Sequence, residues 1–350
     1  MENLIDRFGE PALMCVFGAL IGAVFGAAAQ RSRFCLRAAA VELSEGTPGT
    51  RISIWLVAFS AALAAVQGAV AAGWFDPSST RQLAATGSLS GAVIGGLMFG
   101  AGMILARGCV SRLLVLSATG NLRAIVTGLV VTIVAQAALR GVLAPARESL
   151  AEIWTVQGGA GRLLGAGVPS TIWALLAVGA FGAAWAFGRH CRVPLGQLVG
   201  ATTVGLAVFG GWALTYALSM ASFEVVAVQS VTFTGPSTDT LMALVSDRAV
   251  VPSFGLGLVP GVFAGAMVMA LLRGEARVQR FGTDTPMERY LLGGVLMGFG
   301  SMLAGGCAVG AGMTGGSIMA LTAWLAVFCM WLGAMATHTA LRALPALRGA

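Results

Sequence analysis

Three of the six cysteines lie where an apolar segment is interrupted by glycine or arginine: Cys35, Cys109 and Cys307. A thiol is a soft, polarisable group and a weak hydrogen-bond donor. In a dry pocket it stays protonated and neutral. A neutral thiol can donate to an anion without holding it as strongly as an ammonium group would. These residue types predict a pathway that conducts a small, soft anion past a line of thiols.

The segments around two of these cysteines are copies of each other. GGLMFGAGMILARGC at 95–109 aligns without a gap with GGVLMGFGSMLAGGC at 293–307, 198 residues later. This match indicates an internal repeat. Its glycines allow close backbone approach and leave N–H groups free to bind an anion at the start of a half-helix. Further polar and glycine residues near the breaks could line the pathway: Gln30, Arg33, Gly108, Ser111, Gly306 and Thr314.

The other three cysteines have simpler explanations. Cys15 and Cys329 lie among aliphatic residues, where cysteine acts as a small hydrophobe, and Cys191 lies in a short basic turn. There is no C-x-x-C pair and there are two histidines, so we expect no metal site, no cofactor and no catalytic residue. The arginines are scattered between apolar runs, which argues against nucleic-acid binding.

The elements that must position these residues are membrane helices. The chain is 57% hydrophobic and 10% charged, which predicts an all-α polytopic membrane protein. Apolar runs long enough to cross a bilayer lie at 11–29, 52–74, 89–105, 121–143, 170–187, 195–218, 252–272, 290–304 and 318–341. Three connections are partly apolar and rich in small residues and are predicted to be re-entrant: 30–40, 107–120 and 305–317. The segment 223–248, on the outer side, is a candidate for a fourth. The alternative for each is an ordinary loop.

Arginine placement predicts the orientation. Alternate connections are rich in arginine, which puts the N-terminus outside and the C-terminus in the cytoplasm. The two copies then run in opposite directions, as in the inverted repeats of many transporters. Within one membrane domain, 1–350, we expect a first half at 11–143, a second half at 195–341 and a connecting segment with one span at 144–194. Matching the first span to the sixth through AVFG at 23–26 and 207–210 places Ser219 opposite Cys35.

Three segments make a resemblance specific: QRSRFC at 30–35, GAGMILARGC at 100–109 and GFGSMLAGGCAVGAG at 298–312. They resemble the signature segments of the YeeE/YedE family of bacterial inner-membrane proteins, and the similarity covers nearly the whole chain. Members transport sulfur-containing compounds, with thiosulfate uptake the best-defined activity. The resemblance implies an hourglass-shaped protein with re-entrant helices meeting at a constriction. Thiosulfate would pass along Cys35, Cys109 and Cys307 through S–H hydrogen bonds. The resemblance also implies a cytoplasmic TusA-like sulfur carrier as partner.

Several alternatives stay open from the sequence. The cargo could be another sulfur or selenium species, and the three cysteines could instead exchange disulfides as a membrane thiol oxidoreductase. The glycines could serve helix packing alone in a structural subunit. The arginines near the breaks, Arg31, Arg33, Arg107 and Arg112, could attract an anion or could anchor the helices by the positive-inside rule. No ATP-binding loop or mid-span carboxylate is recognisable, which favours facilitated uptake.

Overall fold

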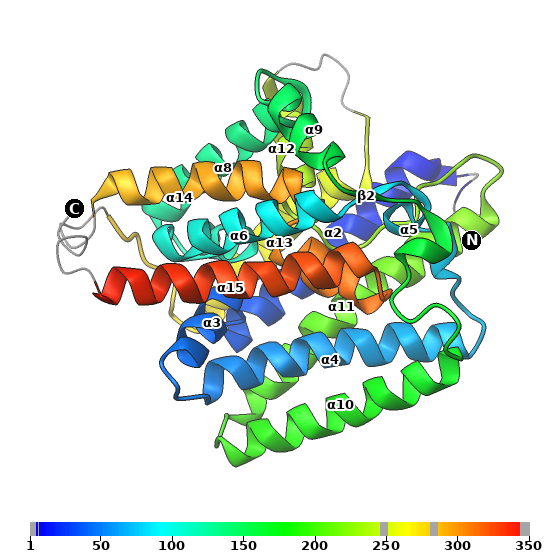
Figure 1. Ribbon diagram of the computed structural model, residues 1–350. Helices are drawn as coiled ribbons and strands as arrows, with labels where there is room; N and C mark the ends of the chain where they lie inside the picture. Colours follow the sequence, from blue (N-terminus) through cyan, green and yellow to red (C-terminus); the bar gives the residue numbers. More distant parts are fainter. Residues whose placement is uncertain (1–4, 6, 246–250, 281–285, 344–350) are drawn as a thin grey trace.

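The fold is a bundle of membrane-length helices (Figure 1). The computed structural model describes residues 5, 7–245, 251–280 and 286–343. Within this part, nine helical stretches are long and apolar enough to cross a membrane. The main helices are α2 (Glu10–Ser32), α4 (Thr50–Ala71), α6 (Leu89–Leu105), α8 (Leu122–Arg140), α10 (Ser170–His190), α11 (Leu195–Ala221), α13 (Phe254–Leu272), α14 (Met287–Leu303) and α15 (Leu321–Ala343). Each coincides with a predicted apolar run, so the all-α polytopic class is confirmed.

Side-chain caps fix where several of these helices begin. The first N–H groups of a helix have no partner within it, and a polar side chain at the N-cap supplies one. Ser88 accepts from Gly91 N at 2.8 Å, and Asn121 accepts from Ala124 N at 3.0 Å. The helix starts are therefore encoded locally. The helices run side by side, and α2 begins at the opposite end of the bundle from the end of α15 (Figure 1).

Four short helices follow four of the long ones. They are α3 (Leu36–Ser44), α7 (Val110–Ala118), α12 (Thr234–Val245) and η3 (Ala308–Gly315), a π-helix. Helices α7, α12 and η3 fall within the segments 107–120, 223–248 and 305–317, whereas α3 begins in the segment 30–40 and extends beyond it to Ser44. Residues 246–248 lie outside the described residues. The dipping of these helices into the bilayer stays a prediction. The remaining elements are η1 (Pro77–Ser79), α5 (Arg81–Ala84), β1 (Gly87–Ser88), α9 (Ala144–Glu152), β2 (Thr155–Val156) and η2 (Gly159–Arg162), with β1 and β2 paired antiparallel.

Glycines bring α6 and α14 into backbone contact. A Cβ atom on Gly102 would lie 2.7 Å from the Gly293 carbonyl oxygen, and one on Gly300 would lie 2.8 Å from the Gly95 carbonyl oxygen. Early residues of one helix therefore meet late residues of the other, so the two helices are antiparallel. The repeat step of 198 residues converts the first contact into the second. The two copies thus contact each other through equivalent glycines.

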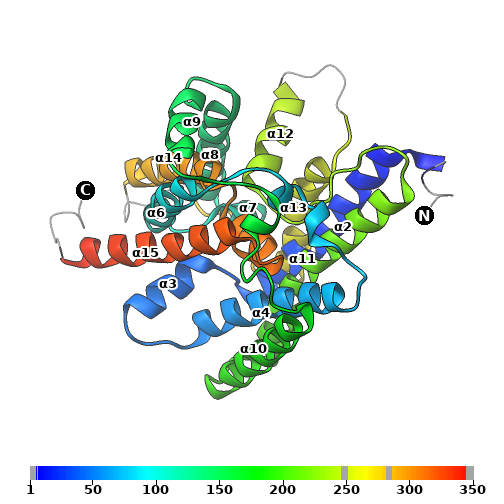
Figure 2. The same cartoon turned by 45° about the vertical axis from the view of Figure 1, so that its right-hand side comes forward.

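The repeat step of 198 residues also relates other helix–helix contacts in the bundle. The packing of α6 on α15 has its counterpart in α14 on α8, and the packing of α3 on α15 has its counterpart in α12 on α8. Helix α10 packs mainly on α4 and lies at the edge of the bundle in both views (Figures 1 and 2). This pattern supports the two halves, 11–143 and 195–341, joined by 144–194. We keep that division as a proposal.

The expected partner of Cys35 in the second half is wrong. Ser219 lies in the last turn of α11, whereas Cys35 directly precedes α3. Helix α12 begins 198 residues after α3, which places Phe233 opposite Cys35. The connection between α11 and α12 is longer than that between α2 and α3, and the AVFG match cannot report this difference. Short alanine–glycine matches carry little register information.

Candidate substrate pathway

Each of the three candidate cysteines is the N-cap residue of a short helix. Cys35 precedes α3, Cys109 precedes α7 and Cys307 precedes η3, and their exposed fractions are 9%, 1% and 1%. Two positions before each cysteine, the backbone adopts a left-handed conformation, at Arg33 (φ 55°), Arg107 (φ 54°) and Gly305 (φ 76°). The chain therefore makes the same break three times, and each break ends in a buried thiol at a helix N-terminus.

Two of the thiols lie at adjoining breaks, and we call them the Cys35–Cys109 pair. Cys35 lines a cavity together with Arg107 and Arg112, which flank Cys109 in the chain. The Cys109 sulfur also lies 3.3 Å from Ser111 Oγ. The breaks after α2 and α6 thus place two sulfur atoms and a hydroxyl together, which is a donor set suited to a small anion with soft and hard atoms.

A polar network lies beside this pair. Gln30 donates to Glu275 Oε2 at 2.7 Å and accepts from Arg112 Nη1 at 3.4 Å. Glu275 also pairs with Arg273 at 3.0 Å and with Arg33 at 3.6 Å. Partial burial opposes ionisation of Glu275, but hydrogen bonds from Arg273 and Gln30 outweigh it and lower the pKa of this carboxyl. The network fixes Gln30 and ties the end of α2 to the segment after α13.

The third thiol belongs to a separate set of contacts around η3. Gly310 N donates to Cys307 Sγ at 3.4 Å, and Thr314 Oγ1 donates to the Val231 carbonyl at 2.5 Å. A Cβ atom on Gly306 would lie 2.9 Å from Ala311 N, so glycine is needed for the chain to turn into this helix. A π-helix is rare and often marks a functional site. The thiol lies at the start of a fully buried turn.

A cavity of about 590 Å³ reaches the Cys35 end of this arrangement. It lies at the end of the bundle that we call the arginine-rich end, where the connections after α2 and α6 and the start of α4 meet. By the positive-inside rule this end is predicted to be cytoplasmic. Its polar lining is mostly cationic and comprises Arg33, Arg37, Arg51, Arg107, Arg112, Glu42, Glu45 and Thr47.

The predicted site residues therefore fall into two groups. Cys35, Cys109, Gln30, Arg33 and Ser111 come together at the arginine-rich end, with Gly108 at the break between α6 and α7. Cys307, Gly306 and Thr314 lie around η3. Sequence reasoning used Arg37 only to predict the orientation in the membrane and kept Arg112 out of the primary site, although both line the cavity with Cys35. Their uncharged counterparts 198 residues later could have identified them.

Comparison with known proteins decides the family. Residues 31–336 match the family described as sulphur transport. The chain belongs to this family. The resemblance to YeeE/YedE proteins is thereby confirmed, and the chain is a transporter rather than a thiol oxidoreductase or another enzyme.

Two curated relatives are similar over nearly their full length. The chain is 26% identical to "Thiosulfate transporter TsuA" of Escherichia coli (strain K12) over 342 residues, which cover 91% of this chain and 92% of the relative. It is also 26% identical to "Thiosulfate transporter TsuA" of Spirochaeta thermophila over 332 residues, which cover 90% of this chain and 96% of the relative.

Proposed function

We propose that this protein takes up thiosulfate, or a closely related small sulfur anion, through a central pathway marked by Cys307, Cys109 and Cys35. The observation that carries the proposal is geometric: Cys35 and Cys109 are buried N-cap residues at adjoining breaks, and Cys35 lines a cavity. The names of the two relatives support thiosulfate as the cargo. Catalytic groups are not needed, since the cargo passes unchanged.

The mechanism uses neutral thiols at helix N-termini. Each thiol donates its S–H to a sulfur or oxygen atom of the anion, and no covalent bond forms. The N-terminal turns of α3 and α7 add the positive ends of their dipoles, which favour an anion at the same place. Because each contact is weak, the anion is released readily to the next group. Weak, sequential donors give conduction rather than tight binding.

The cellular setting follows from the same proposal. The protein lies in a bacterial inner membrane, spans the lipid bilayer with its N-terminus outside and its C-terminus in the cytoplasm, and is built from two inverted halves. The anion enters from the Cys307 side and leaves through the cavity at the arginine-rich end. A cytoplasmic TusA-like sulfur carrier then consumes the sulfur and keeps the internal concentration low.

Growth on thiosulfate tests the proposal. A bacterium that lacks sulfate and thiosulfate uptake should grow on thiosulfate as sole sulfur source when it expresses this chain. Cys109→Ala and Cys307→Ala should each abolish the rescue. The matched control is Cys191→Ala, which removes a half-exposed thiol outside the three breaks and should leave growth intact.

Two results would overturn the proposal. Absence of rescue by the unmodified chain, with the protein present in the membrane, would exclude thiosulfate as cargo. Rescue by the Cys109→Ala and Cys307→Ala chains would exclude the thiol pathway. Competition between labelled thiosulfate and sulfite or selenite in the same cells then measures how narrowly the pathway selects its anion.

A further inference from the structure

The cavity at the arginine-rich end carries more charge than a conducting pathway of neutral thiols requires. Five arginines and two glutamates line it. Arg37 and Arg112 are mostly shielded from solvent, and Arg37 Nε is buried without a hydrogen-bond partner in the described part of the chain. Taking a cation partly out of water without a counter-charge is costly, and both arginines are of intermediate exposure. These two arginines therefore need an explanation beyond the positive-inside rule, which concerns residues that face water.

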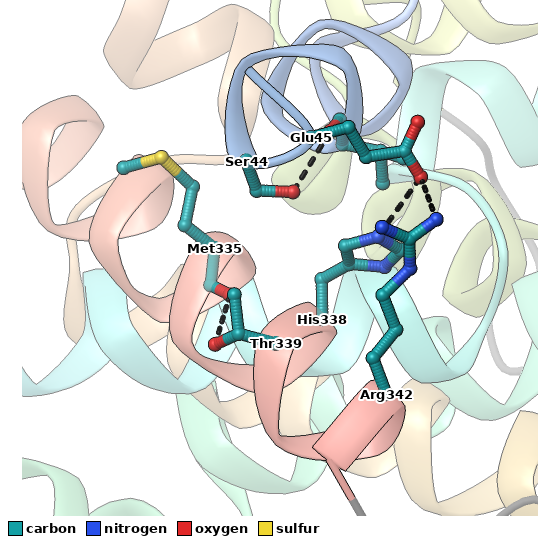
Figure 3. A network of polar contacts seen from close by, with 7 residues as sticks. Ser44, Glu45, Met335, His338, Thr339 and Arg342 are labelled. Carbon is teal, nitrogen blue, oxygen red and sulfur yellow. Dashed lines mark hydrogen bonds and ion pairs between the residues drawn. The ribbon is translucent and has the colours of Figure 1, made fainter.

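The two glutamates do not compensate them. Glu42 Oε2 accepts from Ile52 N at 2.8 Å. Glu45 Oε1 accepts from Arg342 at 2.6 Å and lies 3.3 Å from His338 Nε2, so it ties the end of α3 to the end of α15 (Figure 3). Among the residues that the structure describes, neither Arg37 nor Arg112 forms an ion pair with a carboxylate.

The arginines also stand at unfavourable places in their helices. Arg37 is in the first turn of α3 and Arg112 is in the first turn of α7, and neither turn contains an acidic residue. The positive end of a helix dipole disfavours a cation by a few tenths of a kcal/mol up to ~1 kcal/mol. An anion bound between the two turns would compensate both the guanidinium groups that lack a counter-charge and the positive ends of the helix dipoles, because it interacts favourably with each of them.

The internal repeat shows that this charge is not required by the fold. At the positions 198 residues later, Gly235 replaces Arg37 and Gly310 replaces Arg112. The left-handed residue Arg107 corresponds to Gly305, although glycine adopts that conformation at lower cost. The breaks are alike in the two halves, but at these corresponding positions only the first half carries arginines. We therefore attribute the positive charge of the cavity arginines to the ligand that the cavity binds.

We propose that the cavity is a separate anion-binding station, in which Arg37 and Arg112 bind a small dianionic sulfur oxyanion after it leaves the Cys35–Cys109 pair. Planar guanidinium groups suit the oxygen atoms of such an anion, since each can donate two parallel hydrogen bonds. In the second half, glycines stand at the positions that correspond to Arg37 and Arg112, so the two copies of the break differ in charge. The thiosulfate identity of the oxyanion rests on the proposed function; the anion site itself does not.

Differential labelling of Cys35 tests the station. The full-length protein in detergent is treated with an anionic and with a cationic methanethiosulfonate reagent, and the labelling of the Cys35 peptide is followed by mass spectrometry. Both reagents react with the same thiolate, so the ratio of their rates reports the potential in the cavity and not the acidity of the thiol. Arg37→Gln combined with Arg112→Gln should lower the anionic-to-cationic ratio about tenfold.

Two comparisons make the result specific. Arg189→Gln removes one positive charge, half of what the double variant loses, from an exposed position at the end of α10 and should leave the ratio unchanged. Sodium thiosulfate should slow labelling of Cys35 in the unmodified protein but not in the double variant. If the double variant does not fold, Arg112→Lys keeps the charge and loses the planar donors, so it should retain the ratio and weaken the protection.

The station is overturned if the double variant labels with the same ratio as Arg189→Gln, or if thiosulfate protects both proteins equally. These outcomes differ from failure of the proposed function. If sulfate slows the labelling of Cys35 but thiosulfate does not, and the chain does not rescue growth, the anion station is kept and thiosulfate is rejected as the cargo. Rescue with an unchanged labelling ratio would reject the station alone.

Discussion

At Cys35, Cys109 and Cys307 the chain places a thiol where helices usually begin with serine, threonine, aspartate or asparagine. A thiol is a weaker acceptor than a hydroxyl or carboxylate, so it satisfies the first N–H groups less well. Only Cys307 accepts a hydrogen bond from its own helix that meets ordinary geometry for sulfur. Three weak caps at equivalent breaks are explained by a requirement for soft donors that face an anion.

Arg107 shows the same conflict between stability and function. Its left-handed backbone costs roughly 1–2 kcal/mol for a residue with a side chain, whereas glycine costs about 0.5–1 kcal/mol in chain entropy. We expect Arg107→Gly to raise stability by about 0.5–1 kcal/mol, measured as a higher melting temperature in detergent, and to slow uptake because the cavity loses a charge.

The control for this prediction is Arg107→Ala. Alanine removes the same charge but keeps a Cβ atom in the left-handed conformation, so uptake should fall as in Arg107→Gly without the gain in melting temperature. Equal melting temperatures for the two variants would show that the backbone at this break is not strained.

At the scale of the helices, glycine contacts decide whether the two copies can meet. A Cβ atom on Gly102 or Gly293 would lie 2.6–2.9 Å from backbone atoms of the partner helix. Gly102→Val should therefore force α6 and α14 apart and cost about 1–3 kcal/mol or more, which is seen as loss of monodisperse protein after solubilisation. Gly179→Ala in α10, where a Cβ atom meets open space, should leave the yield unchanged or higher.

Much of this architecture could be predicted from the sequence, because hydropathy reports helix length and direction. The nine spans and the four short segments depend on patterns of ten residues or more. The correspondence between α2 and α11 could not be predicted in this way. The pairing of Cys35 with Phe233 depends on the length of the connection between α11 and α12, which hydropathy does not report. The π-helix at 308–315 also escaped prediction, because glycine-rich turns have no strong preference for one helix type. The cationic cavity depends on long-range packing that brings Arg37, Arg51 and Arg112 together.

Glu275 couples two helix ends and gives a prediction for acid. Its pKa is below the ordinary 4.5, since hydrogen bonds from Arg273 and Gln30 outweigh the effect of partial burial. A lowered carboxyl pKa stabilises the fold above the unfolded-state value, and this contribution is lost as the pH falls through the folded-state value. Glu275→Gln should lower the melting temperature at pH 7 and reduce its further decline between pH 5 and pH 3.

The control for the acid prediction is Glu148→Gln. Glu148 pairs with Arg147 at 2.8 Å at an exposed site, and exposed pairs contribute little, so the melting curve of this variant should follow the unmodified protein. If Glu275→Gln does so as well, the Gln30–Glu275 contact does not hold the helix ends together.

At the scale of the whole molecule, a nearly symmetric scaffold carries an asymmetric charge. The packing of α6, α8, α14 and α15 repeats between the copies, while the arginines of the cavity do not. An anion station at one end changes how long the anion stays there and how fast it leaves. It cannot change the ratio of concentrations at equilibrium, because binding sites alter occupancy and rates but not the free energy of the cargo in the two solutions.

The membrane potential does change that ratio. Moving a dianion into a compartment at −100 mV costs about 4–5 kcal/mol, which corresponds to roughly three orders of magnitude in the concentration ratio. If uptake is facilitated and uncoupled, thiosulfate accumulation in proteoliposomes should fall by about that factor when a potassium gradient with valinomycin makes the inside negative. The thiosulfate accumulated by vesicles that contain the Cys109→Ala variant is subtracted to correct for leakage through the bilayer. Neutralising Arg37 and Arg112 should alter the initial rate and leave the final ratio unchanged. Accumulation that is unaffected or increased by an inside-negative potential would instead require coupling to at least two cations per thiosulfate.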